Sequence, residues 1–246
     1  MKSWPVLAAA LLSPVWAQDP APPPEGALLR LVPTRAPGNH GLLDLSWSPD
    51  GRLLAAACGC REIHVWGIPS WRELPPFTGH EGGVRSVAFT SGGKSLVSTG
   101  SDGMVRVWET AARLPVFSLP GRAAACSPDG LLLAVAAPRE NIRLVDLSTG
   151  REVLRIKGPG GEFQSLDFSP DGRTLVTGDG TGMVQLWDAV VGAERSRFWI
   201  GFRACTQVIW SPDGRALATG TRGRLAYRLW AAPTGDLLFT FPDGNS

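Results

Sequence analysis

The stretch Ser95-Leu-Val-Ser-Thr-Gly-Ser-Asp-Gly-Met-Val-Arg-Val-Trp108 contains the pattern that decides the fold of this 246-residue chain. Two short runs of apolar and β-branched residues, 95–99 and 104–108, flank a turn with two glycines, and the second run ends in tryptophan. Such runs around a glycine-containing turn are typical of a β-hairpin. No segment after the first 17 residues has a sustained 3.6-residue apolar period, so we expect strands and essentially no helix.

The same pattern recurs along the chain. The turn tetrapeptide Ser-Pro-Asp-Gly occurs at 48–51, 127–130, 169–172 and 211–214, and an altered form at 90–93 fills the remaining slot, in steps of 42, 37, 42 and 42 residues. Proline presets the turn and glycine accepts positive φ, so each tetrapeptide is expected to close a hairpin. A second landmark ends the third strand of each unit: Trp66, Trp108, Val145, Trp187 and Trp230. Two landmarks with one period predict five copies of one structural unit.

The composition agrees with many short strands joined by turns. The chain has 30 glycines, 21 prolines and 10 tryptophans, and 43% of its residues are hydrophobic. That apolar content excludes a disordered chain, and a formal net charge of +2 excludes a nucleic-acid binder that works by bulk charge.

A period near 42 residues, with four strands per unit and a tryptophan that ends the third, resembles the WD-repeat β-propeller family over residues 27–241. The resemblance implies an all-β propeller of four-stranded antiparallel blades. The five blades are expected at approximately 40–78, 79–119, 120–157, 158–199 and 200–241.

The second unit matches the family best. In the family, a His, Ser, Asp and Trp at the positions of His80, Ser98, Asp102 and Trp108 form a hydrogen-bonded set that fixes a turn on its blade. Other units depart from this pattern. Cys60, Arg139 and Thr181 replace the aspartate, and Ala56, Val135 and Thr177 replace the serine. We therefore expect the full set in one blade only, and apolar packing alone in most others.

Two ways of completing the propeller follow from the strand count. The segment 27–32 resembles the fourth strand of a preceding unit, while 236–241 gives the fifth unit a fourth strand of its own. Either one of these strands completes blade five of a closed five-bladed ring, which we favour, or the chain is part of a larger ring completed by another chain. Unpaired strand edges would also allow self-association.

The first residues have the composition of a secretory signal. Lys2 precedes an apolar run from Val6 to Ala17, which is shorter than the ~20 residues that a membrane-spanning helix needs. We expect a signal peptide at 1–17, a Pro-rich spacer at 18–26 and a C-terminal tail at 242–246. The protein is then an exported, bacterial-type member of the family, periplasmic or extracellular, with no stable membrane insertion after cleavage.

The cysteines and histidines give no clear chemistry. Cys58 and Cys60 are too close in sequence for an ordinary disulfide, and Cys126 and Cys205 are expected to be buried small hydrophobes. The three histidines do not fall at metal-ligand spacing, and His64 is expected to face solvent. The sequence predicts no metal and no cofactor.

The most favoured function is a non-enzymatic scaffold that binds protein partners, and no nucleic acid. One expected face carries the turns between second and third strands, where arginines replace an acidic residue and form a rim for an acidic partner. The candidate binding residues are Arg61, Arg139, Arg222, Arg224, Trp199 and Phe202. The alternative is a lactonase-like or hydrolase-like enzyme with a site in the central channel, although the first strands offer only Asp44 and Asp167 as acidic residues.

Overall fold

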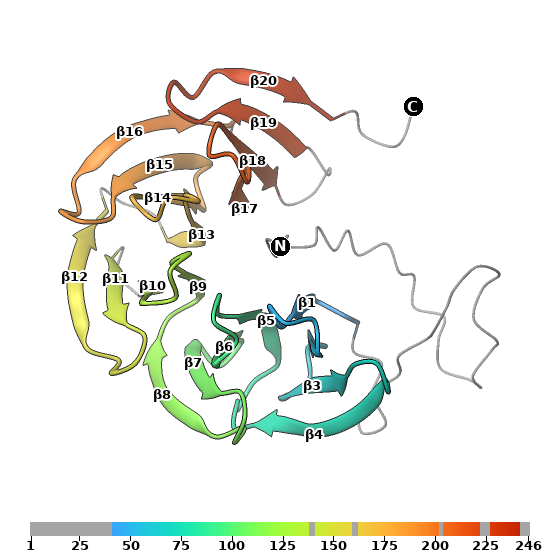
Figure 1. The fold of residues 1–246 in the computed structure, drawn as a ribbon. Helices are drawn as coiled ribbons and strands as arrows, with labels where there is room; N and C mark the ends of the chain where they lie inside the picture. The colour runs from blue at the N-terminus through green and yellow to red at the C-terminus, as the bar shows by residue number, and fades with distance from the viewer. Residues whose placement is uncertain (1–40, 138–140, 159–161, 202–203, 222–226, 242–246) are drawn as a thin grey trace.

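The computed structural model describes residues 41–137, 141–158, 162–201, 204–221 and 227–241. Every regular element in these ranges is a β-strand, and the strands form five antiparallel sheets of four consecutive strands each (Figure 1). This confirms the predicted all-β architecture of four-stranded blades. The predicted signal peptide, spacer, strand at 27–32 and C-terminal tail lie outside the described residues.

The five sheets follow the five sequence units. The first contains β1 (Asp44–Trp47), β2 (Leu53–Ala57), β3 (Glu62–Gly67) and β4 (Arg72–Thr78). The second contains β5 (Val84–Phe89), β6 (Ser95–Gly100), β7 (Met104–Glu109) and β8 (Pro115–Pro120). The third contains β9 (Ala123–Cys126), β10 (Leu132–Ala137), β11 (Asn141–Asp146) and β12 (Glu152–Lys157). The fourth contains β13 (Phe163–Phe168), β14 (Thr174–Asp179), β15 (Met183–Asp188) and β16 (Glu194–Trp199). The fifth contains β17 (Cys205–Trp210), β18 (Ala216–Thr221), β19 (Tyr227–Ala231) and β20 (Leu237–Thr240).

The Ser-Pro-Asp-Gly tetrapeptides close the hairpins between first and second strands. In the first sheet the Ser48 hydroxyl donates to Asp50 Oδ1 at 2.6 Å and accepts from the Leu53 N–H at 2.8 Å. Gly51 takes φ +69°, which favours glycine, and its N–H donates to the Ser48 carbonyl. The same serine–aspartate bond recurs at Ser127, Ser169 and Ser211. The tetrapeptide is therefore a self-contained turn, which explains why it repeats.

The apolar core lies between neighbouring sheets. Ile63 and Phe77 of the first sheet pack with Val87, Leu96 and Trp108 of the second in one buried cluster. The Phe77 and Trp108 rings meet edge to face with centroids 5.7 Å apart. Three of the four interfaces between neighbouring blades bury a tryptophan, and the interface between the second and third blades buries valines and leucines instead. Every blade therefore needs its neighbour to complete its core.

The sheets are arranged around a central axis with the first strands innermost (Figure 1). β13 packs against β17, and β1 packs against β5. Among the described residues, β17 and β1 make no contact of comparable extent, so these parts of the chain form an arc of five blades. β20 pairs with β19 and serves as the fourth strand of the fifth blade. Closure of the ring within one chain stays a prediction.

Candidate functional site

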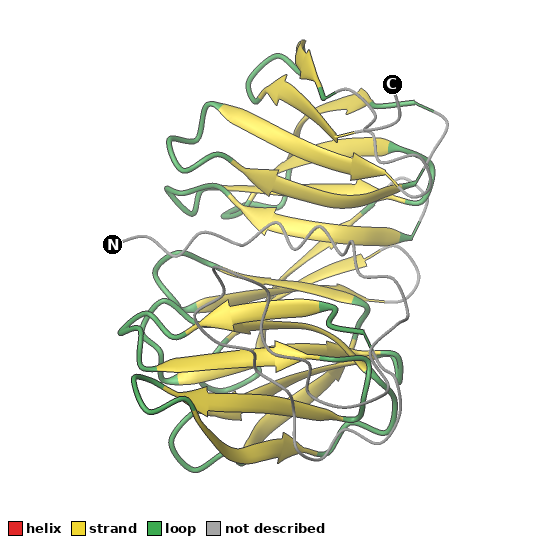
Figure 2. Cartoon of the chain, turned by 90° about the vertical axis from the view of Figure 1, so that its right-hand side faces the viewer, coloured by secondary structure: helices red, strands yellow, loops and turns green. Residues whose placement is uncertain are grey.

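The turns gather at the two ends of the blades (Figure 2). One end, called here the hairpin face, carries the turns at 48–52, 90–94, 127–131, 169–173 and 211–215. The opposite end, called the loop face, carries the turns at 58–61, 101–103 and 180–182 and the connections at 79–83 and 121–122. Strand direction alternates within each sheet, so these two sets of turns lie at opposite ends.

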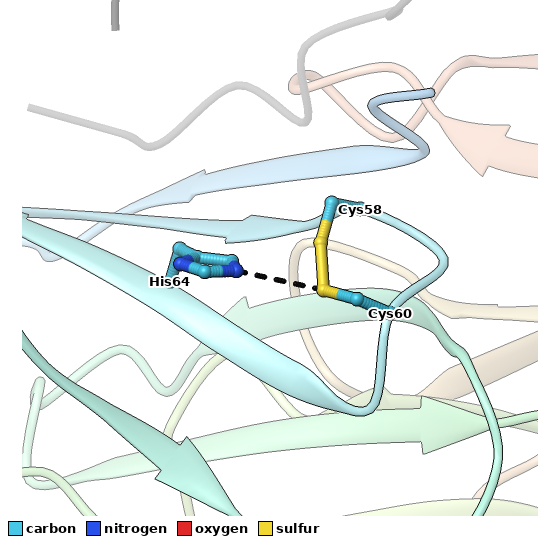
Figure 3. Close-up of side chains that lie close together, drawn as sticks. All are labelled: Cys58, Cys60 and His64. Carbon is cyan, nitrogen blue, oxygen red and sulfur yellow. Dashed lines mark hydrogen bonds between the residues drawn. A yellow bond between two sulfur atoms is a disulfide. The ribbon is translucent and has the colours of Figure 1, made fainter. Parts of the chain in front are cut away.

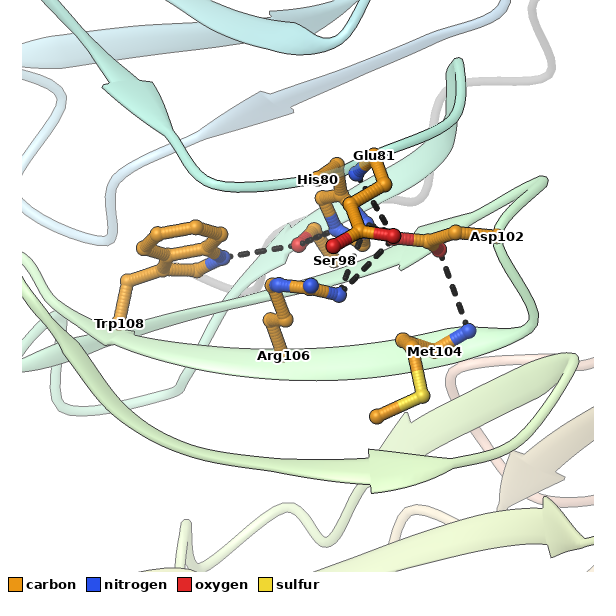
Figure 4. A network of polar contacts seen from close by, with 7 residues as sticks. All are labelled: His80, Glu81, Ser98, Asp102, Met104, Arg106 and Trp108. Atoms are coloured by element: carbon orange, nitrogen blue, oxygen red, sulfur yellow. Dashed lines mark hydrogen bonds and ion pairs between the residues drawn. The ribbon is translucent and has the colours of Figure 1, made fainter.

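The predicted hydrogen-bonded set of the second blade lies beneath the loop face (Figure 4). The Trp108 indole N–H donates to Ser98 Oγ at 2.8 Å, and Ser98 Oγ lies 2.8 Å from His80 Nε2. His80 Nδ1 lies 3.0 Å from Asp102 Oδ2. Since the indole can only donate, we infer that the Ser98 hydroxyl donates to Nε2 and that Nδ1 carries the proton, which it donates to Asp102.

The protonation states of the set follow from its surroundings. Burial lowers the pKa of His80, although Asp102 opposes that shift. Burial tends to raise the pKa of Asp102, but hydrogen bonds from His80 and from the backbone N–H groups of Glu81 and Met104 leave it lowered. Arg106 also pairs with Asp102 at 3.0 Å. The set is thus a neutral imidazole held by an ionised carboxylate.

The order Ser98, His80, Asp102 is also that of a hydrolase triad. However, Ser98 is only 1% exposed, and its oxygen already accepts from the Trp108 indole. A catalytic serine needs its oxygen open to the substrate carbonyl. The hydrogen bonds of His80 therefore join the connection at 79–83 to the turn at 101–103. They leave no room for a substrate at the Ser98 oxygen.

Two further blades satisfy their tryptophans in a way that the sequence reasoning missed. The Trp187 indole N–H donates to Thr177 Oγ1 at 3.0 Å, and the Trp230 indole N–H donates to Thr219 Oγ1 at 2.8 Å. The expectation that most blades are held by apolar packing alone is therefore wrong for blades four and five. Trp66 and Val145, which end the third strands of the other two blades, are also buried.

The first blade departs from two further expectations. Cys58 and Cys60 form a disulfide, contrary to the prediction that they are too close in sequence. Gly59 takes φ +70°, and this tight turn brings the two Cα atoms to 5.2 Å, within the usual disulfide range. His64 was expected to face solvent but is 1% exposed. It stacks on Trp66 with ring centroids 6.2 Å apart.

The first strands of all five sheets line an open cavity of about 810 Å³ along the central axis. Asp44 Oδ2 accepts the Val87 N–H at 2.9 Å, and Asp167 Oδ2 accepts the Trp210 N–H at 2.8 Å. Each of these bonds joins a blade to the next one. Burial raises the pKa of Asp44, and it raises the pKa of Asp167 to about 7.

The two carboxylates therefore act as acceptors between blades. Ser46 and Ser165 make the same kind of bond, to the N–H groups of Phe89 and Val208. No histidine is among the described residues that line the cavity. In each of these bonds the donor and the acceptor lie 43 residues apart in sequence, which is about the length of one repeat. This spacing is the signal by which the sequence could have revealed them.

Few of the predicted binding residues lie in the described part of the chain. Arg61 is exposed in the turn at 58–61. Trp199 ends β16, is 45% exposed, and its indole N–H donates to the Thr181 carbonyl at 3.1 Å. Both lie on the loop face, in different blades. The other four predicted residues lie outside the described ranges: Arg139, Phe202, Arg222 and Arg224. An exposed ion pair of the same face, Arg122 with Glu162, was missed from sequence.

Comparison with known families agrees with this geometry. The model of the "WD domain, G-beta repeat" family, WD40, matches residues 32–67, 71–109 and 150–188. Three segments of the chain are thus similar to WD40 repeats. The three matched segments end at the last residues of the third strands β3, β7 and β15, which are Gly67, Glu109 and Asp188.

Several curated proteins have sequences similar to this chain over about three fifths of its length. Apoptotic protease-activating factor 1 of Rattus norvegicus is 30% identical over 170 residues, which is 63% of this chain and 13% of the relative. Pre-mRNA-processing factor 17 of Homo sapiens is 26% identical over 62% of this chain and 28% of its own length. Transcription initiation factor TFIID subunit 5 of Caenorhabditis elegans is 26% identical over 61% and 24%. The matched part of the chain thus spans only 13% to 28% of the length of these relatives. WD-repeat proteins are typically interaction scaffolds.

Proposed function

We propose that this chain is a non-enzymatic scaffold whose loop face binds a protein partner through Arg61 and Trp199. The observation that carries the proposal is the exposure of both side chains on one face of a rigid array of sheets. WD40 repeats support the general role, since proteins built from them typically bind other proteins.

The sheets supply the rigidity that a binding surface needs. Each blade is a ladder of four hydrogen-bonded strands, and its turns are fixed by side-chain bonds such as the one between His80 and Asp102. Loops held on a rigid scaffold lose little freedom on binding, so more of the contact energy remains as affinity.

The two exposed side chains indicate the chemistry of the partner. The Arg61 guanidinium offers a planar set of donors that suits carboxylates, which favours an acidic partner surface. The Trp199 indole offers apolar area of the kind that dominates interface energies. Because the two residues lie in the first and fourth blades, a partner that contacts both must span the loop face.

Affinity capture with matched variants tests the proposal. The full chain is used as bait, and captured proteins are quantified for wild type, for Arg61→Glu with Trp199→Ala, and for a control with Arg52→Glu and Trp47→Ala. The control residues are also exposed, with Trp47 at 40%, but they lie on or beside the hairpin face. We expect a partner that wild type and control retain and that the loop-face variant loses. Equal capture by all three would contradict the proposal.

We also propose that the protein is exported through the signal at residues 1–17. The basic and apolar composition of that segment supports export, and a disulfide between Cys58 and Cys60 suits an oxidising compartment. Mass spectrometry of the protein from its native source should then find the mature chain beginning at Gln18. A chain that retains Met1 would contradict export by cleavage. The relatives named above come from animals, so a bacterial-type origin stays a prediction.

A further inference from the structure

A cluster of two cysteines and one histidine lies within the first blade (Figure 3). The side chains of Cys58, Cys60 and His64 are buried, and their sulfur and nitrogen ligand atoms all lie within 4.8 Å of one another. His64 Nε2 points at Cys60 Sγ from 3.5 Å. Thiolate sulfur and neutral imidazole nitrogen are the ligand atoms that zinc prefers in proteins.

The local backbone holds the cysteines in place. Gly59 bends the chain between them, its N–H donates to the Val84 carbonyl, and the Val84 N–H donates to the Cys60 carbonyl at 2.7 Å. The turn is thus clamped to β5 of the next blade. The neighbouring Arg61 is exposed, so the cluster lies just beneath the loop face.

A second observation points to a ligand at His64. Its Nδ1 lies 3.0 Å from Glu73 Oε1 on β4, while its Nε2 faces the sulfur. A histidine that binds a metal usually donates its other ring N–H to a carboxylate, which fixes the tautomer and directs the free nitrogen to the ion. Glu73 therefore orients His64 as a positioning residue for a metal ligand does.

We propose that Cys58, Cys60 and His64 form a redox-gated zinc site, closed by the disulfide and opened by reduction. A dithiol or phosphine reductant supplies two electrons, which break the S–S bond, and two protons then complete the two thiols. A dithiol is oxidised to its disulfide and gives up the two protons itself, whereas a phosphine becomes a phosphine oxide, whose oxygen and the two protons come from water. When Zn²⁺ binds, the two thiols release their protons, and Cys58 Sγ, Cys60 Sγ and His64 Nε2 coordinate the ion.

The oxidised pair explains the gating. A disulfide sulfur carries no thiolate charge, so the closed state offers the ion only the imidazole. The thiolates need to separate to about 3.8 Å to bind one zinc at about 2.3 Å each. Since the two residues flank a single glycine, this separation involves the turn at 58–61 and leaves the strands on either side paired.

Cobalt substitution tests the site on the full chain. Co²⁺ bound to thiolates gives charge-transfer absorption in the near ultraviolet and d–d bands in the visible. We expect the reduced wild type to show both bands with one equivalent of Co²⁺ and to lose them when Zn²⁺ is added. The same protein in its disulfide form should show neither. This comparison uses one polypeptide, so it does not depend on the folding of a variant.

Cysteine variants assign the ligands. Cys58→Ser and Cys60→Ser should each weaken the charge-transfer band and lower affinity, whereas Cys126→Ser and Cys205→Ser, at the two free cysteines, should leave both unchanged. Glu73→Gln should lower zinc affinity about 10- to 100-fold while far-ultraviolet circular dichroism stays unchanged. Any of three results would overturn the proposal. The reduced wild type could bind less than one equivalent of metal, the oxidised form could bind as much as the reduced form, or Cys58→Ser could bind as tightly as wild type.

Discussion

Single side chains decide whether buried polar groups find partners in this fold. Ser98 joins two of them, because its oxygen accepts from Trp108 and its hydrogen is donated to His80. In the fourth and fifth blades, Thr177 and Thr219 each accept a hydrogen bond from one buried indole. The cost of a substitution should therefore depend on the number of buried groups that it leaves unpaired.

Ser98→Ala leaves both the Trp108 indole N–H and His80 Nε2 without a partner. An unsatisfied buried polar group costs about 1–3 kcal/mol, so we expect a loss of that size or somewhat more in the free energy of unfolding. Urea denaturation followed by tryptophan fluorescence measures it. Ser118→Ala, at an exposed serine of the same blade, is the control and should change little. An unchanged midpoint for Ser98→Ala would show that the set does not stabilise the blade.

Asp167 gives the protein a distinct pH dependence. Its carboxyl titrates at about 4 in an unfolded chain but at about 7 in the fold, because burial disfavours the charged form. The native state thus binds the proton more tightly, and stability falls as the pH rises from about 4 to about 7. Asp167→Asn removes this fall. The free energy of unfolding of the variant, measured relative to that of wild type, should therefore rise as the pH increases from 4 to 8, by at most about 4 kcal/mol.

The control for this experiment has the opposite sign. A hydrogen bond from Ser169 lowers the pKa of Asp171, in the hairpin turn of the same blade. The stability that it contributes is present above its unfolded pKa and is lost as the pH falls. Asp171→Asn should therefore cost stability at pH 8 and less at pH 3, as measured by urea denaturation at each pH. If Asp167→Asn followed this same trend, burial would not govern Asp167.

At the scale of elements, close approach between blades depends on glycine. A Cβ at Gly83 would overlap the Gly59 carbonyl oxygen and push the turn at 58–61 away from the connection at 79–83. Gly83→Ala should therefore destabilise the protein by about 1–3 kcal/mol. Gly92→Ala, in the hairpin turn of the second blade, meets nothing within 4 Å and should be nearly neutral. Thermal denaturation compares them, and equal midpoints would contradict a tight contact between the turn and the connection.

The sequence predicts elements well where their signal is local. The tetrapeptide turns and the tryptophans at the ends of third strands are visible because each hairpin forms from adjacent residues. The runs expected as strands at 95–99 and 104–108 form β6 and β7, each of which is one residue longer. His64 was misjudged because its burial depends on the neighbouring strand and on Trp66. The bonds that the Val87 and Trp210 N–H groups donate to Asp44 and Asp167 were missed because they cross between blades.

The candidate site shows the same limit. The His80–Asp102 set was identified from a family pattern, since its members lie 22 residues apart and meet only in the folded blade. The disulfide at Cys58 and Cys60 was missed because spacing alone does not show that Gly59 takes positive φ. The sequence thus predicts which turns exist, and the fold decides which side chains those turns bring together.

At the scale of the whole molecule, the arc of five sheets has two ends. β20 has four exposed residues, three of them large and apolar, at the outer edge of the last sheet. In the part of the chain that the structure describes, no helix is long and apolar enough to cross a membrane. A ring that closes within one chain predicts a monomer in sedimentation velocity at micromolar concentration. Dimers or larger species alone would instead favour a ring completed by another chain.

The central claim is that a partner binds the loop face, and hydrogen–deuterium exchange of the captured complex tests it most directly. We predict that the partner slows exchange at the turns 58–61 and 180–182 and at the end of β16, and leaves the hairpin-face turns 48–52 and 169–173 unchanged. Protection confined to the hairpin face, or to the first strands around the central cavity, would contradict the account.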